Sequence, residues 1–96
     1  MKTIYDTIPR GEENAVSMAE LARRWETDER ETRQLIYSAR KDGELICSSV
    51  RGYFRPTSDA ELLAWYRTAK SRSIGTLESL RTARRTLIEH GVNPDR

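Results

Sequence analysis

The chain has 96 residues, of which 36% are hydrophobic and 33% are charged, so its apolar side chains suffice for one small core. A domain of this size buries only about two thirds of the surface that its unfolded chain exposes, which excludes a deep cofactor cleft. The sequence holds one cysteine, Cys47, and one histidine, His90, so neither an internal disulfide nor a Cys/His zinc site is expected. We therefore expect no cofactor and no metal.

The apolar segments are short. The longest uninterrupted apolar run covers residues 62–66, far below the ~18 residues that a membrane-spanning helix requires. Residues 1–6 lack the apolar centre of a secretory signal. Together with the lone cysteine, these patterns predict a cytoplasmic protein.

Charge is unevenly distributed along the chain. Seventeen basic and fifteen acidic residues give a net charge of only +2. Between positions 67 and 85, however, Glu78 is the single acidic residue among six cations: Arg67, Lys70, Arg72, Arg81, Arg84 and Arg85. Most of the cations are arginine, which suits bidentate contacts with phosphate or guanine. A charge run of this kind also fits a solvated helix face, and both interpretations stay open.

Two capped helices are predicted after a short apolar stretch at residues 3–11. Ser17 and Glu20 form a capping-box pattern, which predicts a helix over 18–25 with an apolar stripe. Asp28 and Glu31 repeat the pattern, and the second helix runs over 29–42. Gly43 then supplies the left-handed residue that ends a helix. The turn between the two helices is about three residues long.

A hairpin and a long helix follow. Residues 44–50 and 52–55 alternate as two strands of a β-hairpin. Apolar side chains then recur at helical spacing as far as residue 88, so a third helix is expected over 59–89, about 45 Å long. Gly75 is its weak point, and a fold-back of the helix at that residue is the alternative.

The order of two capped helices, a glycine and a hairpin resembles the winged helix-turn-helix of bacterial and phage or mobile-element DNA-binding proteins. Residues 17–22 and 28–36 look like its helix pair, and residues 43–46 and 52–54 look like the strands that flank the wing. Family core positions are matched by Leu21, Ala22, Trp25 and Leu35. The sequence departs from the pattern at Glu26, where the family often has glycine, at Thr32, where an aliphatic residue is usual, and in lacking an evident first helix.

The resemblance implies a fold that is mainly α with a small β-hairpin: a winged helix-turn-helix over 1–57, a C-terminal helix over 58–90 and a flexible tail over 91–96. It also implies binding of double-stranded DNA by the helix over 29–42 and the wing over 44–55. The residues expected to contact DNA are polar side chains of this helix and wing: Arg30, Arg33, Gln34, Tyr37, Arg40, Lys41, Arg51 and Arg55.

The long helix suggests self-association. A helix longer than the domain it follows would have a face without a partner in its own chain, so we expect a homodimer that pairs two DNA-reading helices. The expected seam lies on the outer turns of that helix: Leu77, Leu80, Arg84, Leu87 and Ile88.

Catalysis is not expected. The sequence has no phosphate-cradling glycine-rich loop, and its carboxylates are dispersed among caps and exposed faces. We therefore predict a DNA-binding transcriptional regulator of phage or mobile-element type. The alternative is a winged-helix module that binds protein, such as a phage-encoded inhibitor of a host nuclease of the anti-CRISPR type, since fold alone does not choose between them.

Overall fold

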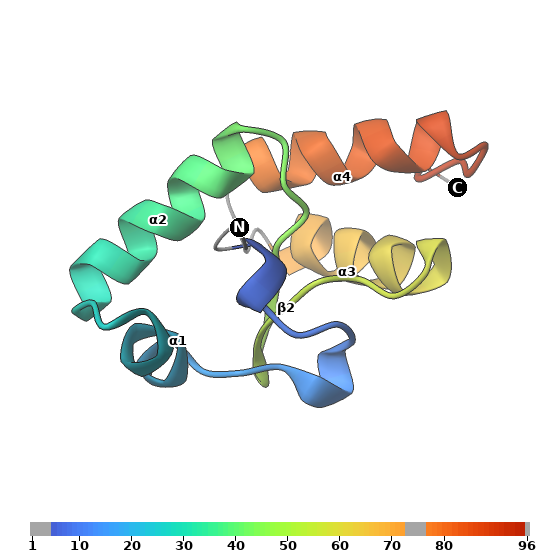
Figure 1. Ribbon diagram of the computed structural model, residues 1–96. Helices are drawn as coiled ribbons and strands as arrows, with labels where there is room; N and C mark the ends of the chain where they lie inside the picture. Colours follow the sequence, from blue (N-terminus) through green and yellow to red (C-terminus); the bar gives the residue numbers. More distant parts are fainter. Residues whose placement is uncertain (1–4, 73–76, 96) are drawn as a thin grey trace.

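The computed structural model describes residues 5–72 and 77–95, and within these ranges it is mainly helical with one small antiparallel sheet (Figure 1). Its main elements, in chain order, are α1 (Met18–Trp25), α2 (Glu29–Lys41), β1 (Cys47–Ser49), β2 (Gly52–Phe54), α3 (Asp59–Arg72) and α4 (Leu77–Glu89). The predicted class, mainly α with a small β-hairpin, is confirmed. No helix in the described ranges is both long and apolar enough to cross a bilayer.

Side-chain caps make both predicted helix starts. The Ser17 hydroxyl accepts a hydrogen bond from the backbone N–H of Glu20 at 3.1 Å, and the Asp28 carboxylate accepts one from the N–H of Glu31 at 2.8 Å. The helix α2 ends at Lys41, and Gly43 follows with φ 97°. Because this left-handed conformation favours glycine, Gly43 ends the helix as predicted.

The turn between α1 and α2 also contains a left-handed residue. Glu26, with φ 55° and ψ 45°, is the only non-glycine residue of positive φ among those described. Winged helix-turn-helix proteins often carry glycine at this place. A residue with a Cβ atom costs about 1–2 kcal/mol in this conformation, so the turn is formed at the expense of local strain.

The hairpin is shorter than predicted. β1 and β2 pair antiparallel with Cys47 opposite Phe54 and Ser49 opposite Gly52, and residues 44–46 lie outside the sheet. The carbonyl of Ile46 is turned toward α2, where it accepts two hydrogen bonds from the Arg40 guanidinium. This interaction ties the approach to the strand to α2 instead of extending the ladder.

The N-terminal segment lies beside β2. Val16 and Tyr53 exchange both backbone hydrogen bonds, at 3.1 and 2.7 Å, in an isolated antiparallel bridge. The backbone N–H groups of Gly11 and Arg55 donate to the carbonyls of Arg55 and Pro9 at 2.8 and 2.7 Å. Residues 9–16 therefore add a broken third row to the hairpin.

The predicted single helix over 59–89 is wrong, and the alternative fold-back describes the chain better. The helices α3 and α4 lie side by side and run in opposite directions (Figure 1). The Asp59 Oδ1 atom at the start of α3 accordingly lies 2.6 Å from the Nδ1 atom of His90, the residue that follows α4. Fully buried Ala69 and Ala83 contribute to the core between the helices, where small side chains allow close approach. Gly75 itself lies outside the described residues.

Two clusters form the core, and they meet at the hairpin. The first consists of Ile8, Leu21, Ile36 and Ile46. The second consists of Cys47, Phe54, Leu62, Trp65, Tyr66, Ala69, Ala83 and Leu87. Because Ile46 and Cys47 are chain neighbours in different clusters, the hairpin links the segment 5–57 to α3 and α4.

Residues 91–95 lie against the helix pair, where a flexible tail was expected. Val92 packs against the second cluster and Pro94 is buried. The Asp95 carboxylate accepts a 2.7 Å hydrogen bond from Arg84 and lies 3.7 Å from the Lys70 ammonium. The Arg84 contact lowers the pKa of Asp95, so the carboxylate is charged at neutral pH and fixes this segment on α3 and α4.

Candidate nucleic-acid interface

The outward face of α2 carries a continuous polar stripe. The stripe, called the α2 stripe below, consists of five exposed side chains, all of them expected from the sequence to contact DNA: Arg30, Arg33, Gln34, Tyr37 and Lys41. Their spacing of 3, 4, 7 and 11 residues from the first places them on one helix face. Thr32 and Ile36, at 0% and 3% exposure, lie on the opposite face and anchor α2 in the core.

The α2 stripe contains three cations and no carboxylate. The acidic residues of the first turn lie at the margin of the stripe. Asp28 caps the helix, and the Glu29 carboxylate forms a long ion pair with Arg33, with 3.9 Å between Oε2 and Nη2. Helices favour carboxylates in their first turn through capping and the helix dipole, which accounts for these residues without a ligand. The stripe is therefore a local positive surface on a nearly neutral chain.

Arg40 does not belong to this surface, contrary to the sequence prediction. Its side chain is 6% exposed, and its Nε and Nη2 groups donate to the Ile46 carbonyl at 3.0 and 2.8 Å. The guanidinium also lies over the Tyr53 ring, 6.0 Å from the centroid. Burial lowers the pKa of Arg40. The residue is a structural bridge between α2 and the hairpin.

Arg55 is likewise used inside the protein. Its side chain is 14% exposed, and its Nε donates to the carbonyl of Ile8 at 2.7 Å. The guanidinium lies 4.9 Å from the centroid of the Tyr5 ring and 3.9 Å from the Asp6 carboxylate. Arg55 therefore ties the N-terminal segment to the end of the hairpin, which leaves little of its side chain for the DNA contact expected of it.

The tip of the hairpin is exposed. Val50 is 98% accessible and Arg51 beside it is also exposed, with its backbone N–H donating to the Ser49 hydroxyl at 3.1 Å. Gly52 closes the turn at φ 123°, and a Cβ atom there would lie 2.2 Å from the Val16 carbonyl oxygen. Of the two predicted wing arginines, Arg51 alone remains available to a ligand.

A hollow of about 300 Å³ connects the α2 stripe to the hairpin. Arg33 and Tyr37 of the stripe line it together with the buried Ile36 and Arg40 of α2, and Tyr53 lines it from β2. Tyr53 is not among the residues expected to contact DNA, and its ring also packs against the first core cluster. Tyr53 precedes Phe54 in β2, and Phe54 is 1% exposed. Because successive side chains of a strand point to opposite faces, this order indicates that Tyr53 lies on the other face of the hairpin.

The predicted dimer seam is not one exposed face. Leu87 is fully buried within its own chain and Leu80 packs partly against the same core, because α4 folds back on α3. Arg84 is bound to Asp95, whereas Ile88 is 49% exposed. The side chain of Leu77 lies outside the described residues.

The single cysteine is buried, and the single histidine is paired with a carboxylate. Burial raises the pKa of the Cys47 thiol to about 12, so the thiol is neutral at physiological pH. His90 is paired with Asp59 at a helix end. Among the described residues, no three His, Cys, Asp or Glu side chains gather in a group that could hold a metal ion.

Comparisons with known proteins add no assignment. No family model, curated protein or solved structure matches this chain. The function is therefore inferred from the α2 stripe, the hairpin tip and the hollow between them.

Proposed function

We propose that this chain binds double-stranded DNA as a winged helix-turn-helix protein. The observation that carries the proposal is the α2 stripe, which offers three cations, an amide and a phenol on one helix face without an intervening carboxylate. An α-helix fits the major groove of B-DNA, and these side-chain types are the ones that read base edges and hold phosphates.

The elements around α2 support this arrangement. A connection of three residues, Glu26 to Asp28, joins α1 to α2, and a hairpin follows α2 after Gly43. The Val16–Tyr53 bridge adds a short strand segment from before α1, beside the two strands of the wing. This order and pairing suit a recognition helix flanked by a wing.

Each exposed group has a role in the proposal. Arg30 and Arg33 are placed to contact guanine O6 and N7, and Gln34 to contact adenine N6 and N7. Tyr37 and Lys41 continue along the same face toward phosphates. Arg51 at the hairpin tip contacts the backbone or the minor groove on one side of the recognition helix.

A regulatory role for a phage or mobile element, with two copies on one site, is part of the proposal. Two-fold pairing would place two α2 helices about 34 Å apart, on successive major-groove turns. Since Leu87 is used inside each chain, such a pair would meet through exposed residues of α4, including Ile88. Light scattering of the free protein and of its DNA complex would give the number of copies in each.

The test is a fluorescence-anisotropy titration of a labelled duplex of about 20 base pairs at several salt concentrations. The logarithm of the binding constant is expected to fall linearly with the logarithm of the salt concentration, because phosphate contacts release counterions. The double variant Arg30→Ala/Arg33→Ala should bind at least about tenfold more weakly and lose its preference among duplexes of different sequence, because each guanine contact supplies about 1–3 kcal/mol of discrimination between bases.

A matched control removes two arginines from α1. Arg23 and Arg24 are exposed and are hydrogen-bonded to Glu20 at 2.6–3.1 Å, so Arg23→Ala/Arg24→Ala makes the same change in formal charge. This variant is expected to retain the affinity and the sequence preference of the natural chain, because Arg23 and Arg24 lie outside the α2 stripe. Equal losses in the two double variants would show attraction by total charge and would overturn the assignment of α2.

The second candidate function is binding to a protein. The observation that favours it is the exposed acidic first turn of α2, with Glu29 and Glu31 at the end of the helix that would enter the groove. No binding to duplex DNA at about 50 mM salt would reject DNA binding and leave this candidate.

A further inference from the structure

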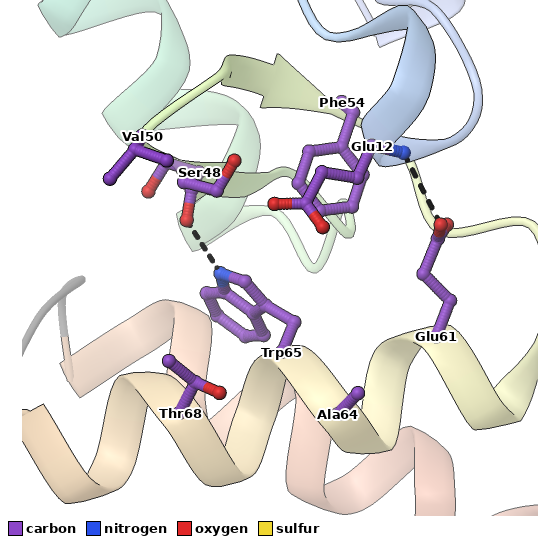
Figure 2. A pocket seen from close by; sticks show the side chains of 9 residues that line it. Glu12, Ser48, Val50, Phe54, Glu61, Ala64, Trp65 and Thr68 are labelled. Carbon is purple, nitrogen blue, oxygen red and sulfur yellow. Dashed lines mark hydrogen bonds between the residues drawn. The ribbon is translucent and has the colours of Figure 1, made fainter.

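A second hollow lies between the hairpin and α3. Its volume is about 230 Å³, below the roughly 300–1,000 Å³ of pockets for drug-sized ligands, so it suits a small molecule. Figure 2 shows Phe54 on one side and Trp65 on the other, with Val50 at the hairpin end and Ala64 on α3. These four residues form the apolar and aromatic part of the wall, and polar residues complete it: Glu12, Ser48, Ser49, Glu61 and Thr68.

The Trp65 side of the pocket is held firmly. The indole N–H donates to the carbonyl of Ser48 at 2.8 Å, which links α3 to β1 (Figure 2). Trp65 is 8% exposed and Phe54 is 1% exposed, so both rings are fixed by the core around them. The pocket is preformed, which reduces the entropy that a ligand would lose in ordering it.

Two carboxylates stand at the pocket, and they differ in their partners. Glu61 is occupied: it accepts hydrogen bonds from the backbone N–H groups of Glu12 and Thr57, at 3.2 and 2.9 Å. The Glu12 carboxylate points between Phe54 and Trp65 (Figure 2), and it has no hydrogen-bond or ion-pair partner in the described part of the chain. One acidic group therefore remains available to a ligand.

The charge and the apolar wall select one ligand chemistry. Two carboxylates disfavour an anion, whereas an ammonium group gains from the Glu12 charge. A short apolar body attached to that ammonium would fill the space between the hairpin and α3 that Val50, Ala64 and Trp65 line. We propose that this pocket binds a small organic cation, a primary amine on a short apolar body, independently of any DNA binding by α2.

The test uses the protein's own two indole groups in a nitrogen–proton correlation spectrum. The probe is 2-phenylethylammonium, compared with its neutral analogue 2-phenylethanol and the anion 3-phenylpropionate. The Trp65 indole signal and the amides of Ser48 and Val50 should shift saturably at millimolar probe, as expected for so few ligand atoms. The Trp25 indole, which is bonded to Thr7 away from the pocket, serves as the internal control and should not move.

The carboxylate is tested by a pair of neighbouring variants. Glu12→Gln should weaken binding of the amine about tenfold, the loss expected for one charge-assisted contact. Glu13→Gln makes the same change at an exposed residue that does not line the pocket, and should bind like the natural chain. Equal binding of the three probes, equal effects of the two variants, or no saturable shift at about 10 mM amine would overturn the proposal.

Discussion

Replacement of Arg40 by alanine separates a structural role from a DNA-binding role. The guanidinium makes two hydrogen bonds to one buried acceptor, the Ile46 carbonyl. In Arg40→Ala this carbonyl loses both donors, and a buried unsatisfied polar group costs about 1–3 kcal/mol. The variant also lacks the aliphatic stem of Arg40 that packs beside Tyr53, which adds to the destabilisation. Removal of a buried charge offsets part of that destabilisation.

The net destabilisation expected for Arg40→Ala is about 2–3 kcal/mol, a large part of the 5–15 kcal/mol that holds a typical domain folded. One kcal/mol corresponds to about 4–8 °C in Tm for a domain of this size, so Tm should fall by about 10–20 °C. Urea denaturation followed by far-ultraviolet circular dichroism gives the free energy of unfolding, and a thermal scan gives Tm.

Arg33→Ala is the control for Arg40→Ala. Arg33 lies on the same helix, but its side chain is 66% exposed, so its replacement should change the free energy of unfolding by less than about 0.5 kcal/mol. At a temperature where both variants are folded, Arg33→Ala should lose DNA affinity and Arg40→Ala should retain it. A stable Arg40→Ala that no longer binds DNA would refute the structural assignment.

Three further changes test local features of the fold. Glu26→Gly should raise the free energy of unfolding by up to about 1 kcal/mol in urea denaturation, because glycine adopts the left-handed turn without strain; a loss of stability would contradict this reasoning. Gly52→Ala should lower the free energy of unfolding by at least about 2 kcal/mol, because the new Cβ would lie 2.2 Å from the Val16 carbonyl oxygen. The Tyr53 amide, which donates to that carbonyl, should lose protection from hydrogen exchange. Unchanged protection would show that the turn adapts. Burial raises the pKa of the Cys47 thiol from 9.0 to about 12, so the unfolded chain loses this proton at lower pH than the folded protein does. The free energy of unfolding should therefore decline as pH rises from about 9 toward 12. Denaturation at pH 8 and at pH 10 measures the decline, and Cys47→Ala should lack the part that comes from the thiol.

Features that depend on neighbouring residues were predictable from the sequence. The caps at Ser17 and Asp28, the helix end at Gly43 and the presence of the hairpin are set by contacts within a few residues. The α2 stripe follows from the same periodicity that buries Ile36 on the other face. Local spacing therefore identified α1, α2 and most of the candidate interface.

Features that depend on distant parts of the chain were not predictable in the same way. Arg40 follows the buried Ile36 by four residues, a signal that it shares the inner face, but its acceptor depends on the path of the chain to Ile46. Arg55 binds the carbonyl of Ile8, 47 residues away, and no local pattern indicates this contact. The fold-back of α4 likewise depends on its apolar stripe packing on α3, not on propensity alone.

The row formed by residues 9–16 has a consequence for solubility. An uncovered strand edge presents backbone N–H and C=O groups to which another chain can add a strand, which leads to aggregation. The outward backbone groups of Tyr53 and Arg55 are already used by Val16, Gly11 and Pro9. Residues 9–16 thus cover the edge of β2 against the addition of a strand from another chain, while the hairpin tip stays open to solvent.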